Sequence, residues 1–310
     1  MKTNAQQFLD LPTEYTAFKN AAVAILPIPY EGGVSYGTGT AAAPDAVIAA
    51  SKHLEFYDEI LEAEPYRMGI VTLMPPEVFL KAERMHAAVF EITKTLIDQN
   101  KFVVMLGGDH SLSFGYFKAL HAIYDPIAVI QLDAHSDLRE TYDNSPYSHA
   151  CVMSRIRELT NDTLQIGIRS MSLEEAQRVE TENLTLCTMS AFRNGEFDIS
   201  AALDALVEPV YLTVDVDVFD WSVIRNTGTP EPGGLLWDEA LTLLQYIFYK
   251  KHIIGFDVVE LSADPYDRNS AFAIAKLIYK MLGFKLAAEV RRGRMNWPDK
   301  PKGNLFQNLL

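Results

Sequence analysis

Three strand-like apolar runs of the sequence are each followed by side chains that can bind a metal ion. The runs are FVVML, IAVIQL and VYLTV, and the side chains that follow them are His110, Asp133, His135, Asp137, Asp215 and Asp217. A strand buried in a parallel sheet is normally apolar on both faces, and an unpaired buried carboxylate costs several kcal/mol. These acids therefore need a compensating positive charge.

The spacing of these residues predicts that their side chains meet. Ligands of open α/β sheets bind at the carboxyl ends of the strands, which is where these residues lie. If extended geometry continues beyond the strands, Asp133, His135 and Asp137 point to one side, because they are spaced by two. The same rule pairs Asp215 with Asp217. Three adjacent strand ends would then present two imidazoles and four carboxylates to one point.

This set of ligands contains oxygen and imidazole nitrogen but no sulfur. It suits a pair of divalent ions such as Mn²⁺, with Fe²⁺, Ni²⁺ or Co²⁺ as alternatives and Zn²⁺ less natural. Two such ions balance four carboxylates and remove the cost of burying them. Each motif alone is more often a helix cap, a turn or a solvated loop. Their occurrence together favours a two-metal hydrolytic centre.

The elements that must position these residues alternate along the chain. Apolar runs predict strands at residues 21–28, 102–106, 127–132, 164–168, 184–187, 210–218 and 253–259. Helical spacing predicts helices at residues 45–61, 77–99, 111–123, 172–179, 237–249 and 269–281. This alternation is typical of a parallel sheet covered by helices on both faces. Without a linker or repeat, we expect one α/β domain over residues 1–310, with its core at about 21–285 and a short N-terminal extension.

Composition restricts the classes of partner. The formal net charge of −14 over 310 residues argues against a nucleic-acid surface and is compatible with a cationic ligand. We expect no membrane span, because about 18 consecutive uncharged apolar residues are absent, and a cytoplasmic location, because the first residues lack the apolar run of a secretory signal. A basic tail is expected to be solvated or to contact another subunit; it contains Arg291, Arg292, Arg294, Lys300 and Lys302.

The ordered motifs resemble those of the ureohydrolase family, which includes arginase and agmatinase. The similarity rests on GGDHS at residues 107–111, DAHSD at 133–137 and DVD at 215–217, and it extends to segments 26–47, 227–234 and 255–261. It implies an arginase-like fold, a three-layer α/β/α sandwich around a mainly parallel eight-stranded sheet. It also implies a homotrimer or a homohexamer.

The resemblance implies a role for each candidate residue. One Mn²⁺ would be held by His110, Asp133, Asp137 and Asp215, and the other by Asp133, His135, Asp215 and Asp217. Water activated by the two ions would attack a guanidinium carbon, so that urea and an amine are released. Asp137 would also pass a proton to the leaving nitrogen. Glu260, at the end of GFDVVE, would bind the guanidinium, and His149 would shuttle protons at the mouth of the site.

The substrate implied by the resemblance is agmatine, which would yield putrescine and urea in a polyamine-forming reaction. Arginases carry an NxHG motif for the α-amino and α-carboxylate groups of the substrate. This chain instead has LRETYDNSPYSHA at residues 138–150, which resembles a branch of agmatinases. One departure from the family pattern is the loop 221–226, where Trp221 and Arg225 occur. Arg225 could face the pocket and favour a guanidino acid such as guanidinobutyrate, or it could face solvent or a neighbouring subunit.

Other interpretations remain open at this point. Arginine or free guanidine are further candidate substrates. Deacetylases that use a single zinc ion share this kind of fold but need fewer acidic ligands than the six side chains present here. A regulatory homologue without turnover would be expected to have lost some of those ligands. The complete set therefore favours a hydrolase that acts on carbon–nitrogen bonds of linear amidines.

Overall fold

A computed structural model describes residues 1–296 of the chain. Its eight strands form one parallel sheet in the order β2-β1-β3-β8-β7-β4-β5-β6. The strands are β1 Val23–Ile28, β2 Ile70–Thr72, β3 Phe102–Gly107, β4 Ala128–Leu132, β5 Thr163–Ile168, β6 Thr185–Thr188, β7 Val210–Asp215 and β8 Ile253–Val259. The expected eight-stranded α/β fold is confirmed.

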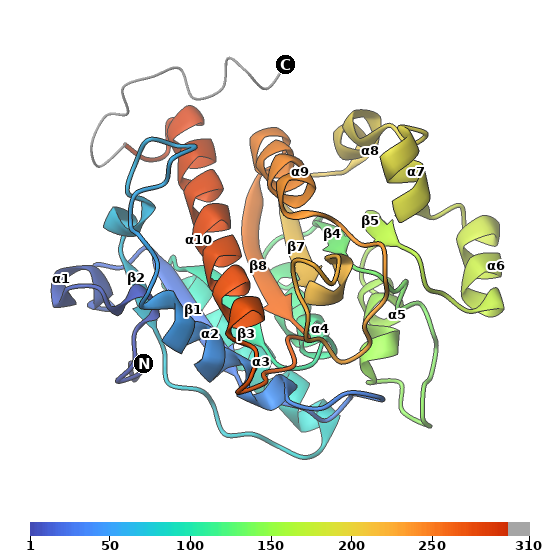
Figure 1. Cartoon of the computed structure of the whole chain (residues 1–310). Helices are drawn as coiled ribbons and strands as arrows, with labels where there is room; N and C mark the ends of the chain where they lie inside the picture. The colour runs from blue at the N-terminus through green and yellow to red at the C-terminus, as the bar shows by residue number, and fades with distance from the viewer. Residues whose placement is uncertain (297–310) are drawn as a thin grey trace.

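Helices cover both faces of the sheet (Figure 1). The α-helices are α1 Thr13–Thr16, α2 Ala43–Ser51, α3 Ala82–Asp98, α4 Leu112–His121, α5 Val152–Ile156, α6 Leu173–Thr181, α7 Met189–Asn194, α8 Ile199–Ala205, α9 Trp237–Lys250 and α10 Arg268–Arg291. Short 3-10 helices are η1 Phe8–Asp10, η2 Thr40–Ala42, η3 Pro65–Met68, η4 His149–Cys151 and η5 Val216–Val218.

Two apolar cores separate the three layers. Ile48 of α2 and Ile278 of α10 belong to the core on one face, whereas Met85 of α3 and Tyr116 of α4 belong to the core on the other. Figure 1 shows α10, in red, crossing the sheet beside α2. Successive residues of a strand face opposite cores. The polar residues of β7 that precede the candidate site therefore lie on the same side as α4.

The observed elements differ from the predicted ones where the sequence signal is short. The three-residue strand β2 and the short helices α1, α5, α7 and α8 were missed, because such brief segments carry no period. The helix predicted at 45–61 ends at Ser51, and the strand predicted at 210–218 ends at Asp215.

Two further expectations concern membrane-spanning helices and the basic tail. No helix among residues 1–296 has the length and apolar character needed to cross a membrane. Of the basic tail, Arg291 donates a hydrogen bond to the Tyr249 carbonyl and Arg294 pairs with Glu289 at 3.0 Å. Lys300 and Lys302 lie outside the described residues.

Candidate metal centre

The candidate site lies at the carboxyl ends of neighbouring strands. His110 follows β3, Asp133 follows β4, and Asp215 ends β7. The expectation of three adjacent strand ends was wrong in one respect, because β8 lies between β3 and β7. That strand contributes Glu260, which follows it directly. Four consecutive strands of the sheet therefore converge on one site.

A tight turn delivers His110 from β3 to the start of α4. Gly108 has no room for a side chain, because a Cβ atom there would lie 1.8 Å from the Tyr30 carbonyl oxygen. Asp109 accepts a hydrogen bond from the Ser111 amide at 2.9 Å and another from the Gly33 amide. The Asp109 side chain thus fixes the turn and the loop that contains Gly33, whereas His110 points toward the acids.

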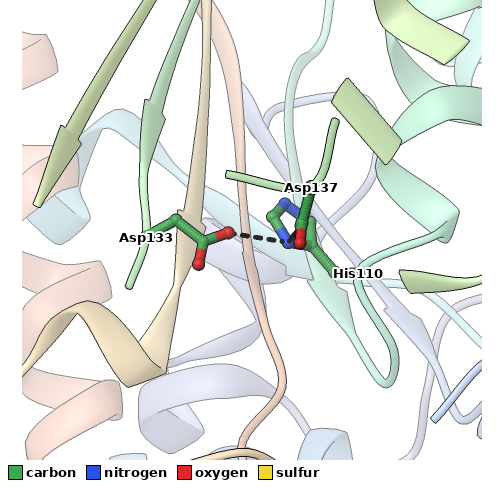
Figure 2. A group of neighbouring side chains, drawn as sticks. All are labelled: His110, Asp133 and Asp137. Carbon is green, nitrogen blue, oxygen red and sulfur yellow. Dashed lines mark ion pairs between the residues drawn. The ribbon is translucent and has the colours of Figure 1, made fainter. Parts of the chain in front are cut away.

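Three carboxylates surround one nitrogen atom of His110. The Nδ1 atom lies 3.2 Å from Asp133 Oδ2, 3.1 Å from Asp137 Oδ2 and 3.3 Å from Asp215 Oδ2. Figure 2 shows the Asp133 and Asp137 carboxylates directed at the imidazole. Ligand atoms of His110, Asp133 and Asp137 all lie within 4.8 Å of one another, a spacing that could hold one metal ion.

A second group shares Asp133 with the first. Ligand atoms of Asp133, His135 and Asp217 also lie within 4.8 Å of one another. His135 Nδ1 is 2.8 Å from Asp217 Oδ2 and 3.8 Å from Asp133 Oδ1. Asp133 therefore has the shared position that the resemblance implies. Asp215, also expected to be shared, approaches His110 and accepts a hydrogen bond from the Asp217 amide at 2.9 Å.

The side chains converge for a different reason than the predicted continuation of extended geometry. Strand β4 ends at Leu132, and Asp137 has a left-handed backbone with φ 53°. After Asp215 the chain enters the 3-10 helix η5. Turns stabilised by the Asp133 and Asp215 side chains, which accept hydrogen bonds from the His135 and Asp217 amides, bring the acids together. A left-handed non-glycine residue such as Asp137 is strained and is common at functional sites.

Burial and mutual repulsion change the protonation of these acids. Burial, followed by the charges of Asp137 and Asp217, raises the pKa of Asp133 to about 8. Burial and neighbouring carboxylates also raise the pKa of Asp215 well above its ordinary value. For Asp217 burial acts in the same direction, but the hydrogen bond and charge of His135 outweigh it and lower the pKa. Asp133 and Asp215 thus favour their protonated forms, which relieves the repulsion between carboxylates.

The pKa values of the two imidazoles are also raised, but against the effect of burial. Burial alone would lower the pKa of His135, but the hydrogen bond and charge of Asp217 raise it to about 11. The pKa of His110 is likewise raised well above its ordinary value, because the three surrounding carboxylates outweigh the effect of burial. Both groups of side chains therefore favour any cation that can replace these protons.

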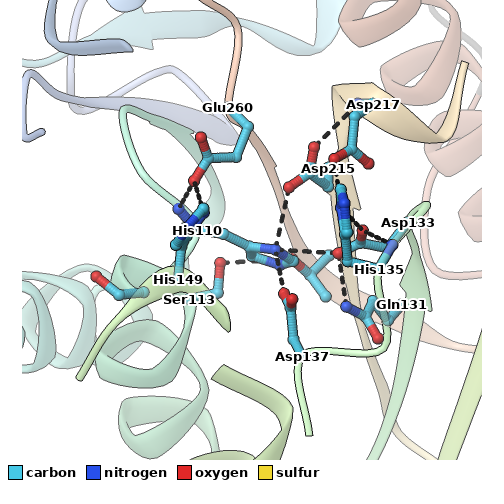
Figure 3. A network of polar contacts seen from close by, with 12 residues as sticks. His110, Ser113, Gln131, Asp133, His135, Asp137, His149, Asp215, Asp217 and Glu260 are labelled. Atoms are coloured by element: carbon cyan, nitrogen blue, oxygen red, sulfur yellow. Dashed lines mark hydrogen bonds and ion pairs between the residues drawn. The ribbon is translucent and has the colours of Figure 1, made fainter. Parts of the chain in front are cut away.

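The residues present fit divalent metal ions. All six predicted ligands lie in this one region (Figure 3). Among residues 1–296, His110 Nδ1 is buried and has no partner with hydrogen-bond geometry, although three carboxylates lie near it. A neutral imidazole nitrogen and carboxylate oxygens are donors that such ions accept. Two ions would also neutralise the excess of acids over imidazoles.

Glu260 and His149 form a second pair beside the candidate metal ligands. The Glu260 carboxylate accepts a hydrogen bond from the His110 amide at 2.7 Å and lies 3.6 Å from His149 Nδ1. Its other oxygen, Oε2, is buried without a hydrogen-bond partner among the described residues. Glu260 also has a left-handed backbone with φ 67°. Figure 3 shows Glu260 directed toward both histidines.

His149 joins this pair to the N-terminal loop. Its Nε2 atom lies 2.9 Å from Ser35 Oγ, and Ser35 belongs to the segment that Asp109 ties down through Gly33. Burial would lower the pKa of His149, but the hydrogen bond and charge of Glu260 raise it to about 9. His149 is 9% exposed. It is therefore a buried residue with partners on both nitrogens, not a residue that faces only solvent.

A cavity of about 220 Å³ opens beside the candidate ligands. Its wall includes His135, Asp137 and His149 together with Arg139. Arg139 is the one lysine or arginine among the described residues that line this cavity. Its Nε atom lies 3.7 Å from Glu175, and its guanidinium lies 5.2 Å from the centre of the Tyr142 ring. The positive charge in the wall is thus already compensated.

The loop 221–226, whose sequence departs from the family pattern, lies against a different cavity. Trp221 and Arg225 line a hollow of about 660 Å³ together with Pro230 and Asn269. Neither Trp221 nor Arg225 is among the residues that line the smaller cavity. Arg225 is exposed, and its amide donates a hydrogen bond to Ser270 Oγ at 2.9 Å. The structure therefore gives no support to a substrate carboxylate bound by Arg225.

Sequence reasoning missed three residues around this site, namely Ser35, Thr213 and Asp257. Thr213 and Asp257 are buried polar residues within the otherwise apolar strands β7 and β8, and that interruption was a visible signal. Ser35 lies in a loop rich in glycine and gave no comparable signal.

The comparison with known families decides the classification. The model of the Arginase family matches residues 21–283. The chain belongs to the arginase family. The predicted resemblance to the ureohydrolase family is confirmed. The predicted enzyme class, a hydrolase that acts on carbon–nitrogen bonds of linear amidines, is also confirmed.

Individual relatives are similar over nearly their whole length. The N(1)-aminopropylagmatine ureohydrolase of Synechocystis sp. is 36% identical over 90% of this chain and 94% of its own. The agmatinase of Pyrococcus horikoshii is 31% identical over 89% of this chain and 95% of its own. The solved structure of the agmatine ureohydrolase of Thermoplasma volcanium has a TM-score of 0.83 and 27% identity, with coverage of 93% of this chain and 97% of its own.

Proposed function

We propose that this member of the arginase family hydrolyses the guanidino group of a small linear cation, with agmatine as the first candidate substrate and putrescine and urea as products. One observation carries the proposal: four carboxylates and two imidazoles converge, mostly buried, beside a cavity of about 220 Å³. The printed names of the relatives, agmatinase and N(1)-aminopropylagmatine ureohydrolase, support the same chemistry.

Two metal ions are part of the proposal. One would be held by His110, Asp133, Asp137 and Asp215, and the other by Asp133, His135, Asp215 and Asp217. We propose Mn²⁺ for both positions, with Ni²⁺, Co²⁺ or Fe²⁺ as alternatives for the same oxygen and nitrogen donors. When bound, the two ions lower the pKa of water and so supply a nucleophile near neutral pH.

The chain's own residues would orient the substrate and move protons. Glu260 has a buried oxygen without a partner and would accept a hydrogen bond from the cationic guanidinium. Asp137 lines the cavity and would pass a proton from water to the leaving nitrogen. His149 would deliver the second proton of the water to the leaving amine, in exchange with solvent. One water is consumed: its oxygen becomes the oxygen of urea, and the amine leaves with the two hydrogens of water as an ammonium ion.

The cavity wall supports an amine rather than an amino acid at the distal end of the substrate. A substrate carboxylate would need a free cation or the donors of an NxHG motif. This chain lacks the motif, and Arg139 is already paired with Glu175 and lies over the Tyr142 ring. Among the described lining residues no other lysine or arginine is present. Arginine and guanidinobutyrate are therefore expected to be poor substrates.

N(1)-aminopropylagmatine is the second candidate substrate. A relative of 36% identity is named for it, as are three further relatives at 31–33% identity. Both candidates present a guanidinium to the metal centre and differ only in the length and charge of the distal chain. The choice between them therefore depends on the outer part of the cavity.

A urea-release screen tests the proposal. The Mn²⁺-loaded and Ni²⁺-loaded protein is assayed with agmatine, N(1)-aminopropylagmatine, arginine, guanidinobutyrate and free guanidine. We expect the highest kcat/KM for agmatine and negligible activity on arginine. A preference for arginine would refute the argument from the cavity wall. Absence of urea release from every guanidine, with both ions bound, would favour a regulatory homologue without turnover.

Assembly and location complete the proposal. We propose a homotrimer or homohexamer in the cytoplasm, with no nucleic-acid or membrane partner, as the family resemblance and the acidic charge suggest. Light scattering coupled to size-exclusion chromatography measures the mass of the assembly directly. A monomer of 34.7 kDa would contradict the expected oligomer.

A further inference from the structure

A buried carboxylate lies behind the candidate metal centre and has no role in the chemistry above. Asp257, in the middle of β8, is 0% exposed. Among residues 1–296 no lysine, arginine or histidine forms an ion pair with it. A buried charge without a compensating partner is costly. The buried Asp257 carboxylate therefore needs a specific interaction that stabilises it.

Two hydroxyl groups on β7 satisfy the Asp257 carboxylate. Thr213 Oγ1 donates a hydrogen bond to Asp257 Oδ1 at 2.7 Å, and the Tyr211 hydroxyl donates to Oδ2. Sheet register opposes Thr213 to Asp257, and alternation puts Tyr211 on the same face as Thr213. Burial raises the pKa of the Asp257 carboxyl, whereas the nearby His110 and hydrogen bonds of Tyr211, Thr213 and Ser113 oppose that rise.

The hydroxyl of Thr213 connects Asp257 to His110. His110 Nε2 lies 2.9 Å from Thr213 Oγ1. A hydroxyl has one proton, and that of Thr213 is donated to the Asp257 carboxylate at 2.7 Å rather than to Ser113 Oγ at 3.4 Å. The Thr213 oxygen must then accept from His110, so the imidazole proton lies on Nε2. When a metal ion replaces the second proton, the neutral imidazole keeps this single N–H, and its lone pair is on Nδ1, the atom that faces the three carboxylates.

We propose that Asp257, acting through Thr213, is a positioning residue that keeps the His110 proton on Nε2 and directs Nδ1 toward one metal ion. Asp257 does not touch the substrate or the ions. The arrangement is an extended form of the hydrogen bond that commonly orients a metal-bound histidine, with a threonine hydroxyl inserted between the histidine and the carboxylate. This inference rests on the proposed metal-dependent function.

Substitutions of Thr213 test the proposal by a binding measurement. Thr213→Val keeps the shape of the side chain and removes the hydroxyl, whereas Thr213→Ser keeps the hydroxyl. The dissociation constants of Mn²⁺ are measured by competition with a fluorescent chelator, and the metal content is measured after dialysis. We expect Thr213→Val to weaken one ion by about 10- to 100-fold, the usual effect of removing such a partner. Thr213→Ser should bind both ions nearly as the unmodified protein does.

A matched control excludes a general effect of replacing a buried threonine. The Thr93 hydroxyl in α3 is buried and has no hydrogen-bond partner among the described residues. Thr93→Val should therefore leave both dissociation constants unchanged. The inference is wrong if Thr213→Val binds both ions normally, or if Thr213→Ser loses as much affinity as Thr213→Val.

A second variant addresses Asp257 itself and remains informative if Thr213→Val does not fold. Asp257→Asn leaves one oxygen that can accept from Thr213 but removes the negative charge. We expect a loss of Mn²⁺ affinity smaller than that of Thr213→Val. Unchanged affinity in Asp257→Asn would overturn the role of Asp257.

The failure of this inference is distinguishable from the failure of the proposed function. An unmodified protein that binds no Mn²⁺ would refute both. An unmodified protein that binds two ions and releases urea, together with a Thr213→Val variant that binds them equally well, would refute only the positioning role.

Discussion

Two regions of this molecule bury charged side chains, and they compensate the charge in different ways. Near α10, the Lys280 ammonium lies 3.2 Å from Asp58 and 2.6 Å from Glu59, so opposite charges of the chain itself meet. At the candidate metal centre, four carboxylates face only two imidazoles. The first region needs nothing from outside the chain. The second has an excess of acids that the proposed metal ions would balance.

This difference separates a structural ion pair from a functional site. Lys280 and Asp58 are almost completely buried, and the Asp58 side chain also accepts hydrogen bonds from the Ile60 and Leu61 amides. Asp58 Oδ2, His110 Nδ1 and Glu260 Oε2 are all buried without hydrogen-bond partners among the described residues, but only Asp58 Oδ2 faces a lysine ammonium. Unsatisfied polar groups next to uncompensated charge indicate where a ligand binds. Four substitutions test this contrast.

The largest effect is expected at the metal centre itself. Asp217→Asn removes a carboxylate that pairs with His135 at 2.8 Å, and it should release one metal ion. We expect kcat/KM for urea release to fall at least about ten-thousandfold, equivalent to roughly 5 kcal/mol. The control is Asp220→Asn, because Asp220 accepts hydrogen bonds from its own loop at Ser222 and lies outside the two groups. Retention of activity by Asp217→Asn would refute the two-metal centre.

The next effect concerns stability in the other region. Lys280→Met leaves the buried Asp58 without its cation and should lower the free energy of unfolding by about 3–5 kcal/mol. Urea release per folded molecule should be unchanged. The double variant Lys280→Met with Asp58→Asn should be more stable than Lys280→Met alone, because the unpaired charge is gone. Equal denaturant midpoints for the two variants would show that charge compensation is not what this pair contributes.

A buried histidine outside both regions sharpens the comparison through pH. Burial lowers the pKa of His86 to about 4 from its ordinary value of 6.5, and its Nδ1 atom has no hydrogen-bond partner among the described residues. The unfolded chain therefore binds more protons below pH 6.5. The resulting stability is fully present above about pH 6.5 and is lost as the pH falls toward 4. The difference between the two pKa values corresponds to about 3 kcal/mol.

His86→Phe tests this effect. The ring contacts with Phe114 and Tyr147 favour an aromatic replacement that does not titrate. Denaturant unfolding is followed between pH 7 and 4 in the presence of a chelator, so that loss of metal ions does not contribute. The decrease in unfolding free energy should be smaller in His86→Phe than in the unmodified protein. His53→Gln, at an exposed position, should behave as the unmodified protein does. Parallel pH profiles for His86→Phe and the unmodified protein would contradict the prediction.

These regions also show which features could be predicted from the sequence. Seven of the eight strands and the gathering of six side chains followed from apolar runs, some of which end in acids and histidines, whereas the eighth strand was expected only from the family resemblance. The local backbone did not follow: Asp137 lies in a left-handed turn, and Asp217 lies in a 3-10 helix, where extended geometry was expected. Turns formed by side chains that bond the neighbouring amides leave no period in a sequence.

Contacts between distant segments were the other limit. The hydrogen bond between Ser35 and His149 spans 114 positions, and only the fold brings these residues together. The pair of Lys280 and Asp58 is similarly distant in the chain. Thr213 and Asp257 could have been noticed, because each interrupts an apolar strand. Their connection to His110, however, depends on β8 lying beside β7. No local pattern in the sequence predicts this order of strands.

The smallest expected effect divides the candidate site into residues that hold metal and residues that move protons. His149 contacts Ser35 and Glu260 but belongs to neither group of candidate ligands. His149→Asn should therefore keep both Mn²⁺ ions and lower kcat by about a hundredfold, with little change in KM. Added imidazole should restore part of the rate, because a free base can then carry the proton. The control Ser35→Ala removes one hydrogen bond to His149 and should have a smaller effect on kcat. If dialysed His149→Asn instead loses an ion, His149 acts through the metal centre, and the separation between holding the ions and transferring protons does not exist in this site.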